Sequence, residues 1–372
     1  MSRSLAARII EASGPNHPAD ACLREFFRSE KGLLPCDKAA ISKTVFTYFR
    51  WKGWLDPQAA LPDQIRQARQ LADAFEQDPG KFDPQELSSR AVPGWVSEEM
   101  EVTPDWARAL QTEPRLWLRA KSGTAPALAT RLGRARPAGP DFPDALLYLG
   151  GEDLFHDKDF REGQFEIQDL ASQAVAIQCA PQPGEKWWDT CAGEGGKTLH
   201  LSELMQNRGL IWASDRSERR LARLKARAAR ARVFNVRLAH WEGTQRLPTR
   251  TFFDGVLVDA PCSGIGTWHR NPHARWTTSS ADVRELALIQ QKLLCLAAQQ
   301  VKPGGKLIYS VCTLTRAETM GVVGNFNRLM PGFVPLDESG FKECRTILPQ
   351  QYGCNGMFIA GWRRDANSGK AE

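Results

Sequence analysis

The chain has 372 residues and a net charge of +6, from 49 Lys and Arg against 43 Asp and Glu. Apolar residues make up 42% of it, so a substantial core can be buried, and the ordinary charged fraction of 25% argues against wholesale disorder. No apolar run approaches the roughly 18 residues that a membrane-spanning helix needs, so the sequence predicts no membrane segment.

The N-terminal part, residues 1–78, is predicted to be a helical domain. Ile41, Val45 and Phe49 recur at the spacing that places apolar side chains on one face of a helix. A chain of this length favours two or three domains, and this is the first of them.

Residues 79–150 are predicted to form a small α+β subdomain. Short strands are expected at Leu116–Leu118 and Ala145–Leu149, on either side of a helix at Ala125–Leu132. The prolines that recur through Gly80–Pro114 leave that stretch without a predicted helix or strand.

Residues 151–372 are predicted to form an α/β domain with a parallel, doubly wound sheet. Short apolar strands alternate here with helical stretches, which is the pattern of a sheet covered by helices on both faces. The expected strands are Lys186–Thr190, Leu210–Ser214, Val236–Ala239, Gly255–Asp259, Lys306–Ser310 and Met357–Trp362.

The first of these strands leads into a glycine-rich turn, 189–198, that precedes a helix. Glycines here let the backbone turn sharply and approach a nucleotide-like ligand. A phosphate-binding P-loop is excluded because Cys191 stands where that motif requires glycine. A dinucleotide fingerprint lacks its last glycine, which is Thr198, whereas S-adenosylmethionine carries no phosphate and tolerates a shorter turn. The turn alone leaves open these two cofactors and a tight turn with no ligand.

The second strand runs to Asp215, where a carboxylate can accept hydrogen bonds from both ribose hydroxyls of an adenosine. The alternative is a helix N-cap, because Asp215 and Ser217 directly precede a helical stretch. Since the glycine turn belongs to the adjacent strand, the two features together favour a nucleoside ligand.

Nine cysteines are scattered along the chain, and none forms a C-x-x-C pair. The sequence therefore predicts no metal site and predicts free thiols in a reducing compartment, the cytoplasm. Two of them, Cys262 and Cys312, closely follow the strands that end at Asp259 and Ser310. Ligands bind outside the carboxyl ends of parallel strands, and these strands are expected to be neighbours, so the two thiols can converge.

Two cysteines at strand ends suit a specific chemistry, although burial in the core is the alternative for either one alone. Carbon 5 of cytosine is too weakly nucleophilic to attack a methyl sulfonium. A thiolate that adds to carbon 6 turns the ring into an enamine, which is nucleophilic at carbon 5. Asp259 could hold the ring nitrogen and the amino group of the base.

Three motifs stand in order along the α/β domain: Cys191-Ala-Gly-Glu-Gly-Gly-Lys-Thr198, Asp259-Ala-Pro-Cys-Ser-Gly264 and Tyr309-Ser-Val-Cys-Thr313. With Ile167–Gln173, His269–Trp276 and Leu348–Phe358, they resemble the motifs of the Sun/RsmB/Nop family of RNA (cytosine-5)-methyltransferases, closest to its bacterial rRNA members. The resemblance covers about residues 150–365. It implies a class I S-adenosylmethionine-dependent methyltransferase fold, which is Rossmann-like.

The resemblance also implies roles for individual residues. Cys312 would be the nucleophile at carbon 6, Cys262 would assist release of the methylated product, and Asp259 would hold the cytosine. In DNA cytosine-5 methyltransferases the Pro-Cys cysteine attacks instead, which makes Cys262 the second candidate nucleophile. S-adenosylmethionine would be bound by Cys191, Ala192, Gly193, Glu194, Gly195, Gly196, Lys197, Asp215, His240 and Asp259.

The cofactor motifs depart from the family at two places. Gly193-Glu194 replaces the usual Ala-Pro before Gly-Gly-Lys. His240 stands where the family often has an Asp near the adenine, so the adenine contact is the part of the site that the resemblance specifies least.

RNA contacts are expected next to the Cys262 loop, from His269, Arg270, Arg275 and Trp276, because basic groups and an aromatic ring suit an extruded or single-stranded base. They are favoured over the arginine-rich stretch 216–232, which is interpreted as a solvated helix face.

Two N-terminal segments resemble RNA-binding parts of the family. Asp37–Arg50 resembles the NusB-like extension of its bacterial rRNA members, and Pro114–Arg119 resembles its small RNA-binding subdomain. We therefore predict a monomeric RNA cytosine-5 methyltransferase that acts on 16S ribosomal RNA. The alternatives are a tRNA substrate and a non-catalytic RNA-binding assembly factor. A DNA methyltransferase is not expected, because little chain follows Cys312 for a target-recognition insert.

Overall fold

A computed structural model of the chain describes residues 2–338, 341–342 and 344–366. Contacts divide the chain into two compact units. The first comprises Met1–Pro114, Ser263–Val283 and Leu348–Gly353, and the second comprises Arg115–Cys262, Arg284–Ile347 and Cys354–Glu372. Each unit is thus assembled from separate stretches of the sequence.

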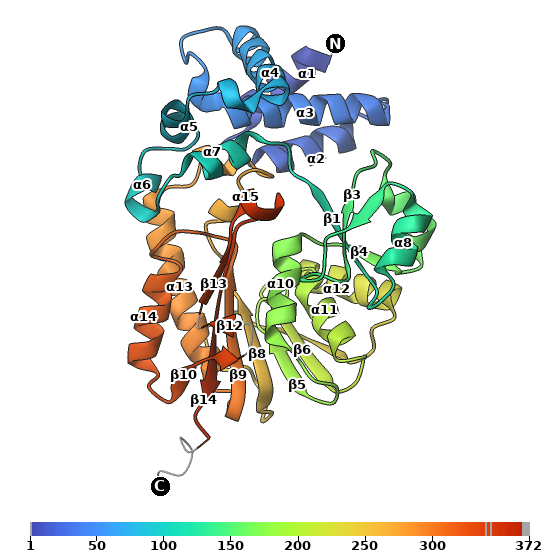
Figure 1. Cartoon of the computed structure of the whole chain (residues 1–372), viewed down its shortest axis with the longest axis vertical. Coiled ribbons are helices and arrows are strands. Elements are labelled where there is room, and N and C mark those ends of the chain that lie inside the picture. Colours follow the sequence, from blue (N-terminus) through green and yellow to red (C-terminus); the bar gives the residue numbers. More distant parts are fainter. Residues whose placement is uncertain (1, 339–340, 343, 367–372) are drawn as a thin grey trace. The chain divides into compact units, whose positions relative to one another are not determined.

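The first unit is helical, as the apolar spacing of the N-terminal residues predicts (Figure 1). Its α-helices are α1 (Ser2–Ala12), α2 (Ala19–Ser29), α3 (Pro35–Trp51), α4 (Leu61–Gln77), α5 (Pro84–Arg90), α6 (Val96–Glu99), α7 (Pro104–Gln111) and α15 (Pro349–Tyr352). Its 3-10 helices are η1 (Lys52–Trp54), η2 (Pro79–Lys81), η4 (Ile265–Thr267) and η5 (Ala274–Trp276).

The stretch that the sequence leaves unassigned contains three of these helices. Helices α5 and α7 begin with Pro84 and Pro104 in their first turn, where a missing backbone N–H costs nothing. The side chains of Asp83 and Thr103 cap them by accepting hydrogen bonds from backbone N–H groups. The prolines therefore mark helix starts. Helices continue to Gln111, beyond the predicted domain boundary at residue 78. The two contact units do not reproduce the division into three domains, which stays a prediction.

The second unit contains the predicted sheet, with eight strands in the order β10-β14-β9-β8-β5-β6-β7 and with β13 paired to β14. Five of them run parallel, and β10, β13 and β14 are antiparallel to their neighbours. The strands are β5 (Lys186–Asp189), β6 (Leu210–Asp215), β7 (Val236–His240), β8 (Phe253–Asp259), β9 (Val301–Val311), β10 (Phe333–Pro335), β13 (Cys344–Ile347) and β14 (Met357–Arg364). A separate two-stranded ribbon is formed by β11 (Asp337–Glu338) and β12 (Phe341–Lys342).

All six strands predicted for this sheet are present. The largest difference is the start of β9, at Val301 rather than Lys306. The intervening Pro-Gly-Gly sequence forms an irregularity in the pairing of β9 with β8, where the register shifts between Phe253 and Gly255, and not a turn that ends the strand.

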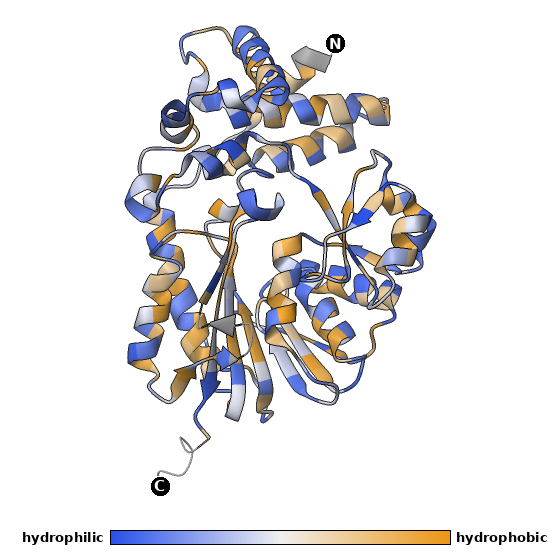
Figure 2. Cartoon of the chain, viewed as in Figure 1, coloured by the Kyte–Doolittle hydropathy of each residue, from blue (hydrophilic) through white to orange (hydrophobic). Residues whose placement is uncertain are grey.

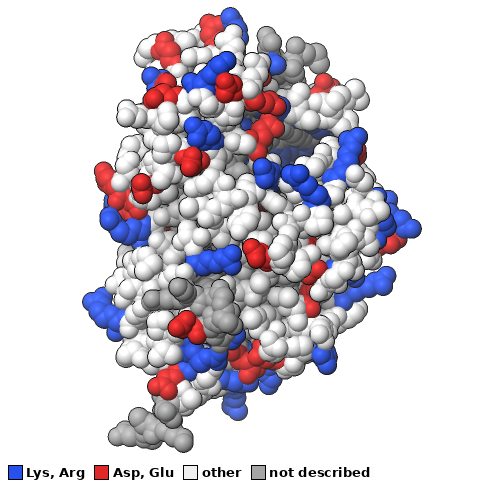
Figure 3. Space-filling model, in the orientation of Figure 1, with Lys and Arg blue, Asp and Glu red and all other residues white. Residues whose placement is uncertain are grey.

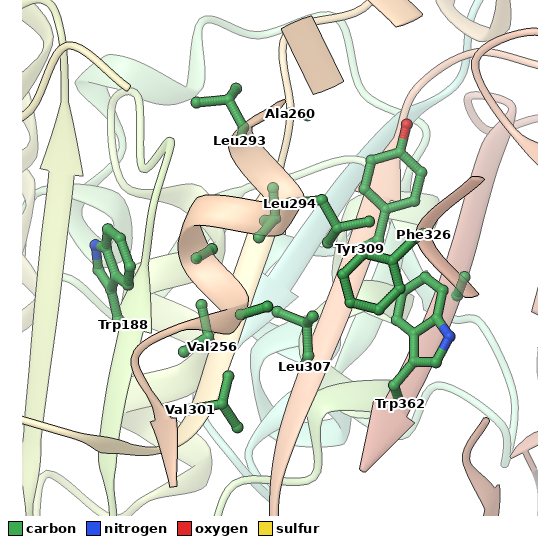
Figure 4. Close-up of a cluster of buried hydrophobic side chains, with 14 of the residues drawn as sticks. Trp188, Val256, Ala260, Leu293, Leu294, Val301, Leu307, Tyr309, Phe326 and Trp362 are labelled. Atoms are coloured by element: carbon green, nitrogen blue, oxygen red, sulfur yellow. The ribbon is translucent and has the colours of Figure 1, made fainter. Parts of the chain in front are cut away.

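Helices cover both faces of the sheet (Figure 1), with α13 and α14 on one side and α10, α11 and α12 on the other. They are α10 (Leu170–Cys179), α11 (Gly196–Leu204), α12 (Glu218–Ala231), α13 (Ser280–Ala298), whose first residues belong to the first unit, and α14 (Met320–Leu329). Figure 2 shows hydrophobic residues along the central strands and mixed colours on the flanking helices. Apolar side chains of α13, α14 and the strands form the main core, including Leu294, Phe326, Val256 and Trp362 (Figure 4).

A small antiparallel sheet precedes the large one in the second unit, with strand order β2-β3-β1-β4. It consists of β1 (Leu116–Ala120), β2 (Ala135–Pro137), β3 (Ala145–Tyr148) and β4 (Phe165–Ile167), with α8 (Ala125–Leu132), η3 (Leu154–His156) and α9 (Lys158–Arg161). Its core contains Leu118, Leu128, Leu146 and Phe165. The two strands and the helix predicted here are confirmed.

The surface carries charges of both signs. Figure 3 shows Lys and Arg interspersed with Asp and Glu on one face of the molecule. Within residues 2–338, 341–342 and 344–366, no helix combines the length and apolarity needed to cross a membrane.

The pairing of β8 with β5 depends on a glycine. A Cβ at Gly255 would lie 2.2 Å from Trp187 Cζ2, and the Trp187 ring is buried in the core, so it has no space to move. We expect Gly255→Ala to lower the free energy of unfolding by about 1–3 kcal/mol through overpacking. Gly324→Ala, at an exposed position of α14 with no neighbour within 4 Å, should be neutral or slightly stabilising. Urea denaturation of the two variants measures this, and equal effects would contradict it.

Candidate active site

A cavity of about 590 Å³ opens at the carboxyl ends of the parallel strands, within the second unit. Pockets for small molecules and cofactors occupy about 300–1,000 Å³, so it is large enough for a nucleoside. Its walls come from the β5–α11 turn, the ends of β6, β8 and β9, and α13. The lining residues include Cys191, Ala192, Gly193, Glu194, Asp215, Asp259, Cys262 and Cys312, which brings most of the predicted site together.

The glycine turn joins β5 to α11 in a conformation that other residues would strain. Gly193 and Gly195 have φ angles of +56° and +89°, in the left-handed region. A Cβ at Gly195 would also lie 2.5 Å from Leu224 Cγ on α12. The turn is held at its start by a hydrogen bond from the Ala192 N–H to the Ser214 carbonyl, at 2.8 Å. Glycine is therefore required both by the backbone and by the close approach of α12.

Asp215 sits at the end of β6 and links the turn to the next loop. Its Oδ2 accepts a hydrogen bond from the Gly193 N–H at 2.9 Å, and its Oδ1 accepts one from the Ser217 N–H at 2.8 Å. Ser217 caps α12. The carboxylate is 5% exposed and borders the cavity, and each oxygen keeps a second lone pair for a ligand. The N-cap of α12 is therefore Ser217 and not Asp215, which orders the turn and borders the cavity, while its contact with a ribose stays a prediction.

Asp259 is the last residue of β8, and its carboxylate lies between polar side chains of two other elements. The ammonium of Lys197 lies 2.7 Å from Asp259 Oδ2, and the Ser310 hydroxyl donates to Oδ1 at 2.7 Å. Burial opposes the charge of Lys197, but the Asp259 carboxylate outweighs that effect, and the pKa of Lys197 is raised above its ordinary value. Lys197 is therefore protonated at neutral pH and fixes the orientation of the Asp259 carboxylate.

The two cysteine thiols meet at the ends of β8 and β9. Cys262 Sγ lies 3.2 Å from Cys312 Sγ, which confirms that the thiols converge. The hydrogen bond from Cys262 lowers the pKa of Cys312, against the effect of burial, and the Lys197 ammonium acts in the same direction. Cys191, in the same cavity, behaves oppositely, because burial raises its pKa to about 12. The environment therefore makes Cys312 more acidic than Cys191.

Buried Asp189, the last residue of β5, lies behind the glycine turn. Its Oδ2 accepts a hydrogen bond from the Thr198 hydroxyl at 2.7 Å, whereas Oδ1 is buried with no hydrogen-bond partner among the described residues. Burial raises the pKa of Asp189 to about 7. Asp189 thus ties the start of α11 to the end of β5 and holds a proton over part of the physiological range.

Several predicted cofactor residues lie outside the cavity lining. Gly195, Gly196 and Lys197 shape the turn or orient Asp259, and His240 contacts the Arg216 carbonyl at 3.0 Å. Glu194 pairs with Arg223 on α12 and borders the cavity.

The loop after β7 and α13 complete the lining with Trp241, Glu242, Thr244, Ile289 and Lys292. The sequence gives little signal for these, because nothing in the local pattern shows that α13 borders the site.

The prediction of RNA contacts is wrong for His269 and Arg275, which are buried. It stays a prediction for Arg270, which is exposed, and for Trp276, which is half-buried. Arg275 is fully buried in the first unit and donates to the backbone carbonyls of Arg50, Ala91 and Leu110. His269 is 4% exposed, and the Trp276 indole N–H donates to the Phe49 carbonyl at 2.6 Å. Burial lowers the pKa of Arg275 to about 9, so the guanidinium is still charged at neutral pH and satisfies carbonyls at helix ends. These residues hold the 263–283 segment in the helical unit.

A model of the family described as "16S rRNA methyltransferase RsmB/F" matches residues 176–363, about half of the chain. The chain belongs to this family. The match includes the glycine turn, Asp215, Asp259 and both cysteines, so the family resemblance predicted from the motifs is confirmed.

Two relatives indicate how far the similarity extends. The probable ribosomal RNA small subunit methyltransferase B of Synechocystis is 38% identical over 219 residues, which are 55% of this chain and 49% of that protein. The ribosomal RNA small subunit methyltransferase B of Salmonella paratyphi B is 31% identical over 285 residues, 72% of this chain and 65% of that protein. The chain thus spans about half to two thirds of the length of these relatives.

A solved structure supports the fold. A methyltransferase homolog protein from Pyrococcus horikoshii superposes with a TM-score of 0.64 and 24% identity, over 79% of this chain and 99% of that one. The predicted class I methyltransferase fold is confirmed. S-adenosylmethionine is the cofactor of this fold and family, and the glycine turn with Asp215 at its side fits the nucleoside part of that molecule.

The raised pKa of Asp189 makes stability depend on pH. The folded-state pKa of about 7 lies above the ordinary value of about 4, so the folded chain binds this proton more tightly than the unfolded chain. The stabilisation that the folded chain gains from binding this proton is present at low pH and is lost as the pH rises to about 7. Relative to Asp189→Asn, we expect the wild type to lose about 3 kcal/mol of unfolding free energy between pH 5 and pH 8.

Asp254 provides the matched control, because its pKa is lowered by its bonds with Lys302 and Lys186 despite burial. Its contribution is already complete above pH 5, so the difference between the wild type and Asp254→Asn should be constant over that range. Urea denaturation at several pH values measures both differences. A constant difference for Asp189→Asn would show that its carboxyl is ionised throughout.

Proposed function

We propose that this chain is an S-adenosylmethionine-dependent RNA methyltransferase that methylates carbon 5 of a cytosine in 16S ribosomal RNA. The observation that carries the proposal is the 3.2 Å separation of the Cys262 and Cys312 sulfurs, in one cavity with the glycine turn and Asp259. The family and the relatives named small subunit methyltransferase B support ribosomal RNA as the substrate.

The cofactor would be held at the β5 and β6 ends of the cavity. Residues 191–194 would contact it through the backbone of the turn, and Asp215 would accept hydrogen bonds from its ribose hydroxyls. When bound, S-adenosylmethionine supplies an electrophilic methyl group on a sulfonium. Arg216 and Arg220 border the same end of the cavity and are further candidates for polar contacts with the nucleoside.

Cys312 would act as the nucleophile. Its thiolate adds to carbon 6 of the cytosine, and the electron pair of the 5,6 double bond becomes available at carbon 5, which takes the methyl group. The lowered pKa of Cys312 favours this role, because the hydrogen bond from Cys262 and the charge of Lys197 both stabilise the thiolate. Cys262 is the alternative nucleophile, because its sulfur lies in the same cavity, 3.2 Å from that of Cys312.

Asp259 would hold the base while the ring is attacked. Each of its oxygens accepts one hydrogen bond, from Lys197 and from Ser310, and has a lone pair left for the ring nitrogen and amino group of cytosine. A fixed, charged carboxylate at this place stabilises the positive charge that a protonated ring nitrogen carries during addition. Lys197 in turn keeps Asp259 from moving away with the base.

Cys262 would act after methyl transfer. Its thiolate would take the carbon 5 proton, the electron pair of that C–H bond would re-form the 5,6 double bond, and the electron pair of the carbon 6–sulfur bond would leave with Cys312 as a thiolate. Cys262 is assigned to this step because its sulfur lies 3.2 Å from that of Cys312. A non-catalytic assembly factor would have no need for two thiols in contact beside an ordered carboxylate, which disfavours that alternative.

Loss of the nucleophile provides the first test. We expect Cys312→Ser to reduce methylation by at least about 10³-fold, because a serine hydroxyl is not ionised at neutral pH. Bisulfite sequencing of 16S ribosomal RNA from cells lacking the gene, after incubation with the protein and S-adenosylmethionine, identifies the methylated cytosine. Cys295→Ser, a half-buried thiol on α13 away from the cavity, is the control and should stay active. Full activity of Cys312→Ser would exclude Cys312 as the nucleophile.

Loss of the releasing cysteine should give a different result. Cys262→Ala is expected to form the Cys312–RNA bond and to release the product slowly, so that a covalent protein–RNA complex accumulates. A band that resists denaturing electrophoresis measures this complex, and the double variant Cys262→Ala/Cys312→Ser should lack it. A covalent complex that persists in the double variant would assign the bond to another residue.

A further inference from the structure

The two cysteine-bearing segments are connected behind the thiols by buried hydrogen bonds. Gln290, on α13, donates from Nε2 to the backbone carbonyl of Pro261 at 2.9 Å and to Glu318 Oε1 at 2.9 Å. Pro261 directly precedes Cys262. The Gln290 side chain is fully buried, so these bonds form without competition from water.

Glu318 extends the connection to the other cysteine. Its Oε2 accepts hydrogen bonds from the hydroxyls of Thr313 at 3.0 Å and Thr315 at 2.9 Å. Thr313 directly follows Cys312. A continuous path of hydrogen bonds therefore links the residue before one thiol to the residue after the other, through Gln290 and Glu318.

Tyr309 fixes the orientation of the Gln290 amide. Its hydroxyl lies 2.9 Å from Gln290 Oε1 and 2.7 Å from the backbone carbonyl of Glu318. Figure 4 shows this hydroxyl at the edge of the apolar core, pointing away from Phe326 and Trp362. Because Tyr309 belongs to β9, the strand that leads to Cys312, the network is anchored in the sheet as well as in α13.

We propose that Gln290 and Glu318 are positioning residues that hold Cys262 and Cys312 at the separation needed for both to act on one base. This inference rests on the proposed function. Of the described residues, those that line the cavity include Pro261 but neither Gln290 nor Glu318, so the two side chains act through the cysteine segments and do not contact a substrate.

The physical reason is that strand pairing alone does not fix the thiols. Cys262 lies three residues beyond Asp259, the last residue of β8 that pairs with β9. Cys312 follows Val311, which pairs with Phe358 of β14, so neither cysteine is itself a paired residue of the β8–β9 ladder. A hydrogen bond between two sulfurs at 3.2 Å weakens steeply with displacement. The Gln290 amide connects the two segments. It donates to the Pro261 carbonyl on one side and to Glu318 on the other, and Glu318 in turn accepts a hydrogen bond from Thr313. Loss of this amide lets the two segments shift independently.

The reactivity of the Cys312 thiol reports its distance from Cys262 without any methylation assay. The groups that act on the Cys312 sulfur are Cys262, Asp259 and Lys197. We expect Gln290→Met, in the full-length chain, to move the pH midpoint of Cys312 alkylation by iodoacetamide upward by about one unit, with about tenfold slower alkylation at pH 7. Mass spectrometry of the Cys312 peptide measures the rate, and Cys262→Ala gives the shift for complete loss of the thiol contact.

Gln300→Met is the matched control. Gln300 is also a fully buried glutamine of the second unit, and it bonds the Leu247 N–H and the Thr251 carbonyl, away from the thiols. A merely structural role for Gln290 predicts that both variants lose stability and that neither shifts the Cys312 profile. An unchanged profile in folded Gln290→Met would overturn the proposal.

Thr313→Val is a milder variant in case Gln290→Met does not fold. It removes one hydrogen bond to Glu318 and keeps the side-chain volume nearly the same, so a smaller upward shift of the Cys312 midpoint is expected. No shift in this variant would also overturn the proposal. If the wild type methylates RNA, Gln290→Met should lower kcat with little change in the KM for RNA. If the wild type methylates no RNA, the proposed function fails, while the alkylation profiles still decide whether the network positions the thiols.

Discussion

Parallel pairing of β8 with β9, with Asp259 opposite Ser310, determines where the reactive groups of this protein lie. Both strands are fully buried over most of their length, so their register is fixed by packing on two faces and cannot slip without exposing the core. The chain leaves both strands at the same edge of the sheet. Cys262 and Cys312, which are 50 positions apart in sequence, are thereby brought to the same edge of the sheet, where their sulfurs lie 3.2 Å apart.

Charge in the site is organised around that strand pair. Lys197, from the start of α11, and Ser310, from β9, both bind Asp259, so one carboxylate joins the cofactor turn to the cysteine strands. The low polarity of the surroundings strengthens each of these contacts. Burial has the opposite consequence for Asp189 and Cys191, whose pKa values it raises. Thiols in the same cavity therefore differ in acidity through their hydrogen-bond and charge partners, as Cys312 and Cys191 do.

The segment that follows Cys262 shows how a chemically suggestive sequence can serve packing. Basic and aromatic residues beside a cysteine loop are typical of a nucleic-acid contact. Arg275, however, donates its hydrogen bonds to three backbone carbonyls of the helical unit. Arg50, at the end of α3, is likewise buried and donates to the His269 carbonyl at 3.0 Å. Because carbonyls at helix ends need donors, a buried arginine can satisfy several of them at once. Residue type alone does not distinguish this role from RNA binding.

The sequence by itself determined the α/β class, the six strands of the main sheet, the glycine turn and the two cysteines. Each follows from local information: apolar runs of strand length, glycines where φ must be positive, and motifs whose spacing is short. Tertiary structure alone decided that Pro84 and Pro104 start helices, that Arg275 is internal, and that α13 contributes Lys292 to the cavity and Gln290 to the cysteine segments. The last two depend on which segments pack together, at a separation of 29 residues for Gln290 and Pro261 and of 165 or more for the partners of Arg275, and no local pattern encodes burial or hydrogen-bond partners at such separations. The contact between Cys262 and Cys312 depends on both sequence and tertiary structure. The sequence predicts that both cysteines follow strand ends, but only the folded sheet shows that their sulfurs are in contact.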